Sequence, residues 1–280
     1  MNWRKIEENF FRTLMFVSTM LMGGVLMLIL VAISKNGLPS LTWEMLTQAP
    51  KGGYYFGREG GIANAILGSL YLSIGAVMLA LIIALPVALF LNIHMKNHER
   101  WVHIIRFLMD TLWGIPSIVY GAFAFMIMIY LGMKASLLAG IITVALFVLP
   151  IMIRSMDEVI RGVPEGLLET GLSLGANRTE VAFKIFVRQC STGFVTAILL
   201  ALGRAIGDAA AVIFTAGFSD RIPTSLSKPA ATLPLAIFFQ LNSPIEEVKS
   251  RAYAAAVVLT LMVLIISILS RYFSQKLKKH

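Results

Sequence analysis

Two charged residues, Arg204 and Asp208, lie four positions apart inside an otherwise apolar stretch of the sequence. A charge deep in a membrane costs at least about 2.5–3.5 kcal/mol, so each side chain needs a partner or a polar pathway. A guanidinium group offers planar N–H donors that match the oxygens of an oxyanion, and a nearby carboxylate can hold that group in place. Two interpretations are open: Arg204 binds a passing anion, or the two residues pair with each other on one helix face.

Residues 154–191 form a second region of interest, because their pattern is helical and mixed in charge. Pro164 suits the first turn of a helix, and leucines and glycines follow it at helical spacing. Asn177 and Glu180 have the spacing of a capping box, which predicts a second helix through 181–187. The sequence therefore predicts a helix-turn-helix here, and its composition alone favours a helix lying at the membrane surface.

The composition indicates the elements that position these residues. The chain has 280 residues, of which 58% are hydrophobic and only 14% are charged, and its mean hydropathy is +0.80. About a quarter of the residues in soluble domains are charged, so this composition argues against a soluble protein. Apolar segments long enough to cross a bilayer lie at about 12–33, 67–93, 105–131, 135–153, 192–218 and 252–273. They predict an all-α integral membrane protein with six transmembrane helices.

The basic residues predict the orientation of these helices. Fifteen of the 24 Lys and Arg residues fall on one side of the predicted membrane and eight on the other, while Arg204 lies within a span. Cytoplasmic flanks retain positive charge, so both termini and the 154–191 segment are expected in the cytoplasm. Two long loops, at about 34–66 and 219–251, then face the outside. This bias also accounts for the net charge of +9 without a nucleic-acid partner.

Motifs for nucleotide binding and for zinc-dependent hydrolysis are missing from the sequence. It contains no Gly-x-x-x-x-Gly-Lys-Ser/Thr phosphate-binding loop and no His-Glu-x-x-His. His94 and His98 have the i, i+4 spacing of metal ligands, but no acidic or thiol side chain completes a set. We therefore expect no ATPase activity of its own, no cofactor and no metal site.

The 154–191 segment resembles the EAA loop of ABC-importer permeases, which has the pattern Glu-Ala-Ala-x3-Gly-x9-Ile-x-Leu-Pro. Glu169, Gly175 and Ile185 stand at its spacing. The departures from the pattern are Thr170, Gly171, Val187 and Arg188. In that family the loop contains a coupling helix that docks into a groove of the ATP-binding subunit.

Three further motifs resemble phosphate-transport permeases of the ABC-importer family. They are 59–66 (EGGIANAI), 116–121 (PSIVYG) and 231–238 (ATLPLAIF). The resemblance extends from about residue 20 to 273. It implies the architecture of a type I ABC-importer permease, with one transmembrane permease domain over 1–280 that includes the cytoplasmic coupling loop 154–191.

The resemblance also implies a function and partners. The expected function is the import of inorganic phosphate across the cytoplasmic membrane of a prokaryote, with substrate-pathway residues Arg204, Asp208 and Arg154; the family usually has Glu at the position of Asp208. The expected partners are a sister permease, two ATP-binding subunits, an extracytoplasmic phosphate-binding protein and membrane lipid.

Two alternatives stay open at this stage. In one, the chain is a channel or an ion-coupled anion carrier, with Arg204 and Asp208 as gate or proton relay. In the other, the same architecture carries a different oxyanion, such as sulfate or molybdate, because a guanidinium group does not by itself discriminate among anions.

Overall fold

The computed structural model describes residues 2–51, 60–96, 98–164 and 166–277, and its regular elements are helices. Four helices are each long and apolar enough to cross a membrane. They are α1 (Asn2–Gly37), α3 (Ala63–Leu89), α6 (Leu137–Arg161) and α12 (Glu246–Leu277). The prediction of an all-α membrane protein is confirmed. The α6 helix extends beyond the apolar segment predicted to end at 153, so Arg154 is a helical residue.

Two further membrane-crossing candidates are bent pairs of helices. The first pairs α4 (Glu99–Gly114) with α5 (Ser117–Tyr130) at 96°, so the apolar segment predicted over 105–131 is interrupted by a sharp bend. Pro116 lies at the break and restricts Ile115 to an extended backbone, which ends α4. If each bent pair counts as one span, the described residues allow up to six spans. The exact number of spans and the side of the membrane on which each terminus lies stay predictions.

The second bent pair ends in α10 (Ser191–Gly207), which follows the helical run Arg178–Gln189 at 75°. The predicted apolar segment 192–218 is therefore not one helix. Beyond Gly207 the chain folds into turns, in which the amides of Thr215 and Ala216 both donate to the Val212 carbonyl, at 3.1 and 3.0 Å. The charged residues of the GRAIGDAAA stretch thus lie at a helix end and not in a helix interior.

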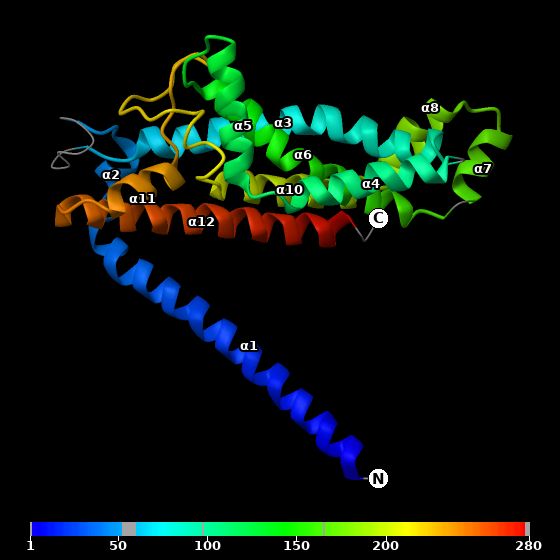
Figure 1. Cartoon of the computed structure of the whole chain (residues 1–280), viewed down its shortest axis with the longest axis horizontal. Coiled ribbons are helices and arrows are strands. Elements are labelled where there is room, and N and C mark those ends of the chain that lie inside the picture. The colour runs from blue at the N-terminus through cyan, green and yellow to red at the C-terminus, as the bar shows by residue number, and fades with distance from the viewer. Residues whose placement is uncertain (1, 52–59, 97, 165, 278–280) are drawn as a thin grey trace.

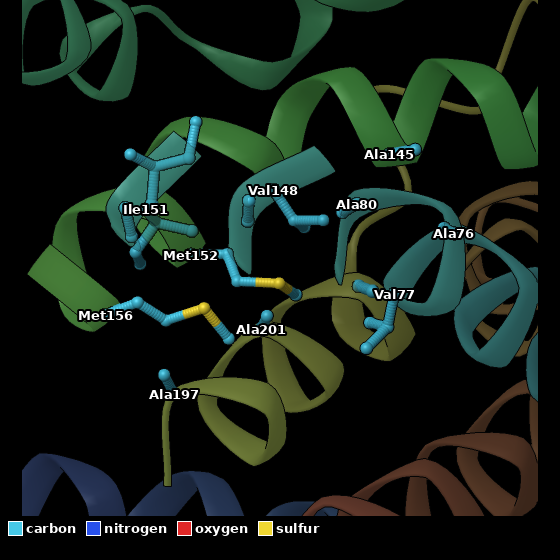
Figure 2. Close-up of a cluster of buried hydrophobic side chains, with 14 of the residues drawn as sticks. Ala76, Val77, Ala80, Ala145, Val148, Ile151, Met152, Met156, Ala197 and Ala201 are labelled. Carbon is cyan, nitrogen blue, oxygen red and sulfur yellow. The ribbon is translucent and has the colours of Figure 1, made fainter. Parts of the chain in front are cut away.

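The core forms where α3, α6 and α10 pack together. Figure 2 shows small side chains of α3 and α10 facing larger ones of α6, which lets the three backbones approach closely. The labelled residues are Ala76, Val77 and Ala80 of α3, Ala145, Val148, Ile151, Met152 and Met156 of α6, and Ala197 and Ala201 of α10. This packing fixes the helices that carry both charged clusters described below.

The molecule is elongated, and its two ends differ (Figure 1). One end carries the short helices α7 (Gly166–Ser173) and α8 (Arg178–Glu180), and the other carries α2 (Trp43–Thr47) and α11 (Leu233–Leu241). Helix α1 leaves the body from its contact with α12 near Gly37, and both termini point toward the α7 and α8 end.

Candidate functional site

Arg204 lies in the last turn of α10, and its side chain reaches toward α6. The guanidinium carbon is 4.5 Å from the centroid of the Phe147 ring, which is a cation–π contact. The residue is exposed, and it makes no hydrogen bond or ion pair with the residues that the structure describes. Its N–H donors are therefore unused within this part of the chain.

Asp208 does not share a helix face with Arg204, so the interpretation in which the two residues pair with each other on one face is wrong. The residue follows the end of α10 in an extended conformation, with φ −87° and ψ 120°. Its Oδ1 accepts hydrogen bonds from the backbone N–H groups of Ala210 (2.8 Å) and Ala211 (3.2 Å), and from the Ser117 hydroxyl (3.2 Å). Asp208 therefore stabilises the turn after α10 and fastens it to the start of α5.

Helix α5 and the turn after α10 are also in close backbone contact, and the contact on the α5 side is at Gly121. A Cβ atom at this position would lie 2.7 Å from the Ala211 carbonyl oxygen and 2.9 Å from that of Ala210. Only glycine permits this approach without displacement of the turn. The 116–121 motif and the turn that follows α10, which are remote in sequence, are thus in contact.

The 231–238 motif serves the opposite end of the molecule. Leu233, the first residue of α11, donates its backbone N–H to the Ser69 hydroxyl of α3 at 2.8 Å. Gly68 lies against the Ala231 carbonyl, with no room for a Cβ atom. This motif therefore packs α11 against α3. Glu59, the first residue of the 59–66 motif, lies outside the described residues.

A second charged cluster, the Asp157 network, joins α4, α6 and the π-helix η2 (Phe90–His94) that ends α3. The Asp157 side chain is only 1% exposed. It accepts hydrogen bonds from Arg106 Nε (2.9 Å) and a terminal Arg106 nitrogen (2.8 Å), from Arg154 (3.0 Å) and from Asn92 Nδ2 (2.8 Å). Arg154 also pairs with Asp110 at 2.9 Å. The two carboxylates and two guanidinium groups balance one another in charge.

The network also shows which groups Arg106 and Arg154 bind. Arg106 and Asp110, four residues apart on α4, look like a local ion pair in the sequence, but each binds a partner from α6. Arg154, expected in the substrate pathway, has its guanidinium occupied by two carboxylates. It lies seven residues beyond Phe147, which is about 10 Å along the helix.

Sequence reasoning missed Asp157 and Asn92, although α6 carries a signal for the first of these. Ile153 and Ile160 are buried on one face of α6, and Asp157 lies between them at the i+4 and i+7 spacing of that face. A charged residue within an apolar stripe needs a buried partner. No comparable pattern marks Asn92 in the sequence.

The first helix of the 154–191 segment, α7, ends in a Schellman motif. Gly175 has φ +85°, and the amides of Gly175 and Ala176 donate to the carbonyls of Leu172 (3.0 Å) and Gly171 (3.2 Å). Glycine is needed here because other residues avoid this conformation. Glu169 is exposed and has no partner among the described residues.

The predicted capping box of the second helix is confirmed. Asn177 Oδ1 accepts the Glu180 amide at 2.8 Å, and Glu180 accepts the Asn177 amide at 3.1 Å. The hydrogen bond from the Asn177 amide, followed by the contact with Lys184, lowers the pKa of Glu180 from its ordinary value. A π-helix, η3 (Val181–Phe186), follows, and Ile185 packs on Gly171 of α7. The two helices therefore form one unit.

The described residues offer no cluster of three or more His, Cys, Asp or Glu side chains that could hold a metal ion. His94, which has metal-ligand spacing with His98, stacks on the ring of Phe90 with centroids 5.4 Å apart. The chemistry available at Arg204 is that of a guanidinium group with unused donors beside an aromatic ring.

Comparison with known proteins places this geometry in a family. Residues 84–279 match the family described as "Binding-protein-dependent transport system inner membrane component". The chain is 30% identical to the phosphate transport system permease protein PstA of Haemophilus influenzae, over 99% of this chain and 96% of that protein. It is 32% identical to PstA of Yersinia pestis, over 99% and 93%.

A solved structure shows the same fold. The chain aligns with a bacterial alginate ABC transporter, solved in complex with a periplasmic protein bound to an alginate pentasaccharide, with a TM-score of 0.64 and 13% identity. The alignment covers 99% of this chain and 98% of that chain. The fold is that of a type I ABC-importer permease, and such permease subunits are not themselves enzymes. The chain therefore belongs to the binding-protein-dependent transport system inner membrane components, which are multi-pass permeases of the prokaryotic inner membrane.

Proposed function

We propose that this chain is the permease subunit of an ATP-driven importer that carries inorganic phosphate into the cell. Its relatives from Haemophilus influenzae and Yersinia pestis are phosphate transport permeases and match it over nearly their full length. The observation that carries the proposal is the state of Arg204. A guanidinium group with unused donors, in an apolar part of the chain, can be compensated by the oxygens of a passing phosphate.

Asp208 has a different role in this proposal. Its carboxylate is held by Ser117 and by two backbone amides, so it does not neutralise Arg204. A fixed negative charge one residue past the helix end opposes tight anion binding, and it thereby favours release over permanent occupancy. Arg154 can line the cytoplasmic exit of the substrate pathway and contact phosphate there only if its ion pairs with Asp110 and Asp157 break.

The 154–191 segment is the coupling loop in this proposal. The exposed Glu169 and the glycine-capped end of α7 offer a docking surface to an ATP-binding subunit, which is where ATP hydrolysis takes place. The complete importer contains this chain, a sister permease, two ATP-binding subunits and an extracytoplasmic phosphate-binding protein. The cytoplasmic position of the loop follows from the charge bias and belongs to the proposal.

The proposed mechanism depends on contacts of this chain that differ between the inward-open and the outward-open state. Closure of the ATP-binding dimer displaces both coupling loops, and the helices rock from an inward-open to an outward-open arrangement that accepts phosphate. Hydrolysis reverses the movement. ATP binds to the partner subunits in this proposal, so this chain contributes by packing differently in the two states.

The test is phosphate uptake by proteoliposomes that contain the complete complex and its binding protein, with and without internal ATP. Wild type is compared with Glu169→Lys, and with Glu158→Lys as a control for an exposed carboxylate on α6. We expect uptake that depends on ATP, is abolished by Glu169→Lys in assembled complexes, and survives Glu158→Lys.

Two results would overturn the proposal. Phosphate flux through this chain without ATP would instead support a channel or an ion-coupled carrier. Uptake of sulfate or molybdate at the expense of phosphate, under equal competition, would keep the architecture and change the cargo.

A further inference from the structure

Arg178 connects the 154–191 segment to the end of α3. This residue follows the Asn177 cap, and one terminal guanidinium nitrogen donates to the carbonyls of Ile93 (3.1 Å) and His94 (3.2 Å). These carbonyls belong to the last turn of η2, where helix geometry leaves no partner further along the helix. The side chain thus supplies donors that the helix end lacks.

The η2 helix is in turn connected to the Asp157 network by the residue just before Ile93. Asn92 donates to Asp157 at 2.8 Å and accepts from Arg106 at 3.2 Å. It also donates to the Ala88 carbonyl at 2.9 Å, which fixes its side chain to its own helix. A continuous series of polar contacts therefore extends from Arg178 through η2 to α4 and α6.

Both ends of this series are rigid. At the segment end, Gly171 of α7 packs against Val181 and Ile185 of η3, and the buried Leu168 and Phe186 belong to the main hydrophobic core. At the other end, the Asp157 carboxylate is buried and accepts hydrogen bonds from Arg106, Arg154 and Asn92. A network of this kind shifts as a unit, because stretching it leaves a buried charge without its partners.

We propose that Arg178 and Asn92 are positioning residues that transmit displacement of the 154–191 segment to α4 and α6 through the Asp157 network. The inference rests on the proposed function, since an ATP-binding partner must displace the segment. Movement of the docking surface then reaches α6, whose Phe147 contacts Arg204, without passing along the backbone of 162–177. Coupling free energies between distant sites typically change the affinity at one site by about fivefold or more when the other site is occupied.

The experiment measures phosphate transported per ATP hydrolysed, in proteoliposomes with the complete complex and binding protein. The variants are Arg178→Gln, Asn92→Ala and the double variant, none of which leaves Asp157 without its arginines. Arg188→Gln is the matched control, because Arg188 is an exposed arginine of the same segment with no partner among the described residues.

We expect each single variant to assemble and to hydrolyse ATP, while its transport per ATP falls about fivefold or more. The double variant should lose no more than the worse single variant, because the two residues lie in one series. Arg188→Gln should keep the wild-type ratio.

Three results would overturn the inference: a wild-type ratio in Arg178→Gln, losses that multiply in the double variant, or an equal loss in Arg188→Gln. All three leave the proposed function intact, because wild type still transports. If wild type itself moves no phosphate with ATP, the proposed function fails, and this inference fails with it.

Discussion

The molecule contains two clusters of arginine and carboxylate side chains that differ in how their charges are satisfied. In the Asp157 network, Arg106 and Arg154 each bind carboxylates, and the acid at its centre is buried. Around α10, Arg204 contacts an aromatic ring, while Asp208 is occupied by Ser117 and backbone amides. The first arrangement joins helices, and the second leaves a positive charge available to a ligand.

The difference shows why an arginine in a membrane helix does not by itself mark a transport pathway. A guanidinium group that two carboxylates neutralise gains little from an anion, since binding requires those pairs to open. A guanidinium group stabilised only by a cation–π contact keeps its hydrogen-bond donors. The partners of each arginine, rather than its depth, therefore separate Arg204 from Arg154.

The largest effect on stability is expected at the centre of the network. Asp157→Ala leaves two guanidinium groups without their shared carboxylate, and we expect the free energy of unfolding to fall by about 3 kcal/mol, at the low end for buried pairs because both arginines are partly exposed. SDS titration in mixed micelles measures this. Glu158→Ala, at the exposed neighbour, should change it little. Equal effects of the two variants would contradict a structural role for the network.

A smaller loss is expected where α5 meets the turn after α10. Gly121→Ala forces a Cβ atom against the Ala210 and Ala211 carbonyls, and overpacking of this kind costs about 1–3 kcal/mol. Since the same turn holds Asp208, phosphate uptake should fall with stability. Gly114→Ala is the control, because a Cβ atom there contacts nothing within 4 Å. Wild-type uptake in Gly121→Ala would show that the close contact is dispensable.

Gly175→Ala tests the cap of α7. Nothing lies near a Cβ atom at this position, so the cost arises from the φ of +85° alone and should be about 1 kcal/mol, confined to the 154–191 segment. Hydrogen exchange of residues 166–176 should become faster. Gly166→Ala, at the other end of α7 and also without neighbours, should not have this effect. Faster exchange in both variants would point to a cause other than the cap.

The smallest effect on stability is expected at Arg204. Removing its side chain in Arg204→Ala loses only the contact with Phe147, so the free energy of unfolding should change by less than about 1 kcal/mol. Measured beside Asp157→Ala, this variant sharpens the contrast between the two clusters. A loss as large as that of Asp157→Ala would mean that Arg204 has a structural partner.

The sequence predicts local features of this fold well. The capping box of Asn177 and Glu180 and the helix pair of the 154–191 segment depend on residues close in sequence, and the structure confirms them. Apolar segments likewise locate the long helices, because twenty apolar residues in a row have few other stable forms.

Features that depend on distant parts of the chain could not be predicted in this way. Apolar residues lie on both sides of the break at Pro116, so composition does not reveal how sharp the 96° bend is. Residues 209–216 are apolar too, which conceals the end of α10 and places Asp208 wrongly on a helix face. The local pairing of Arg106 with Asp110 fails for the same reason, since better partners come from α6.

The most direct test of the central claim is the initial rate of ATP-driven phosphate uptake by the complete complex with Arg204→Lys and Arg204→Gln, beside ATP hydrolysis by the same vesicles. Losing a charge-assisted hydrogen-bond donor to the substrate should lower uptake about tenfold or more in Arg204→Gln, with Arg204→Lys between it and wild type and with assembly unchanged. Wild-type uptake in Arg204→Gln would contradict a role for this guanidinium group in moving phosphate.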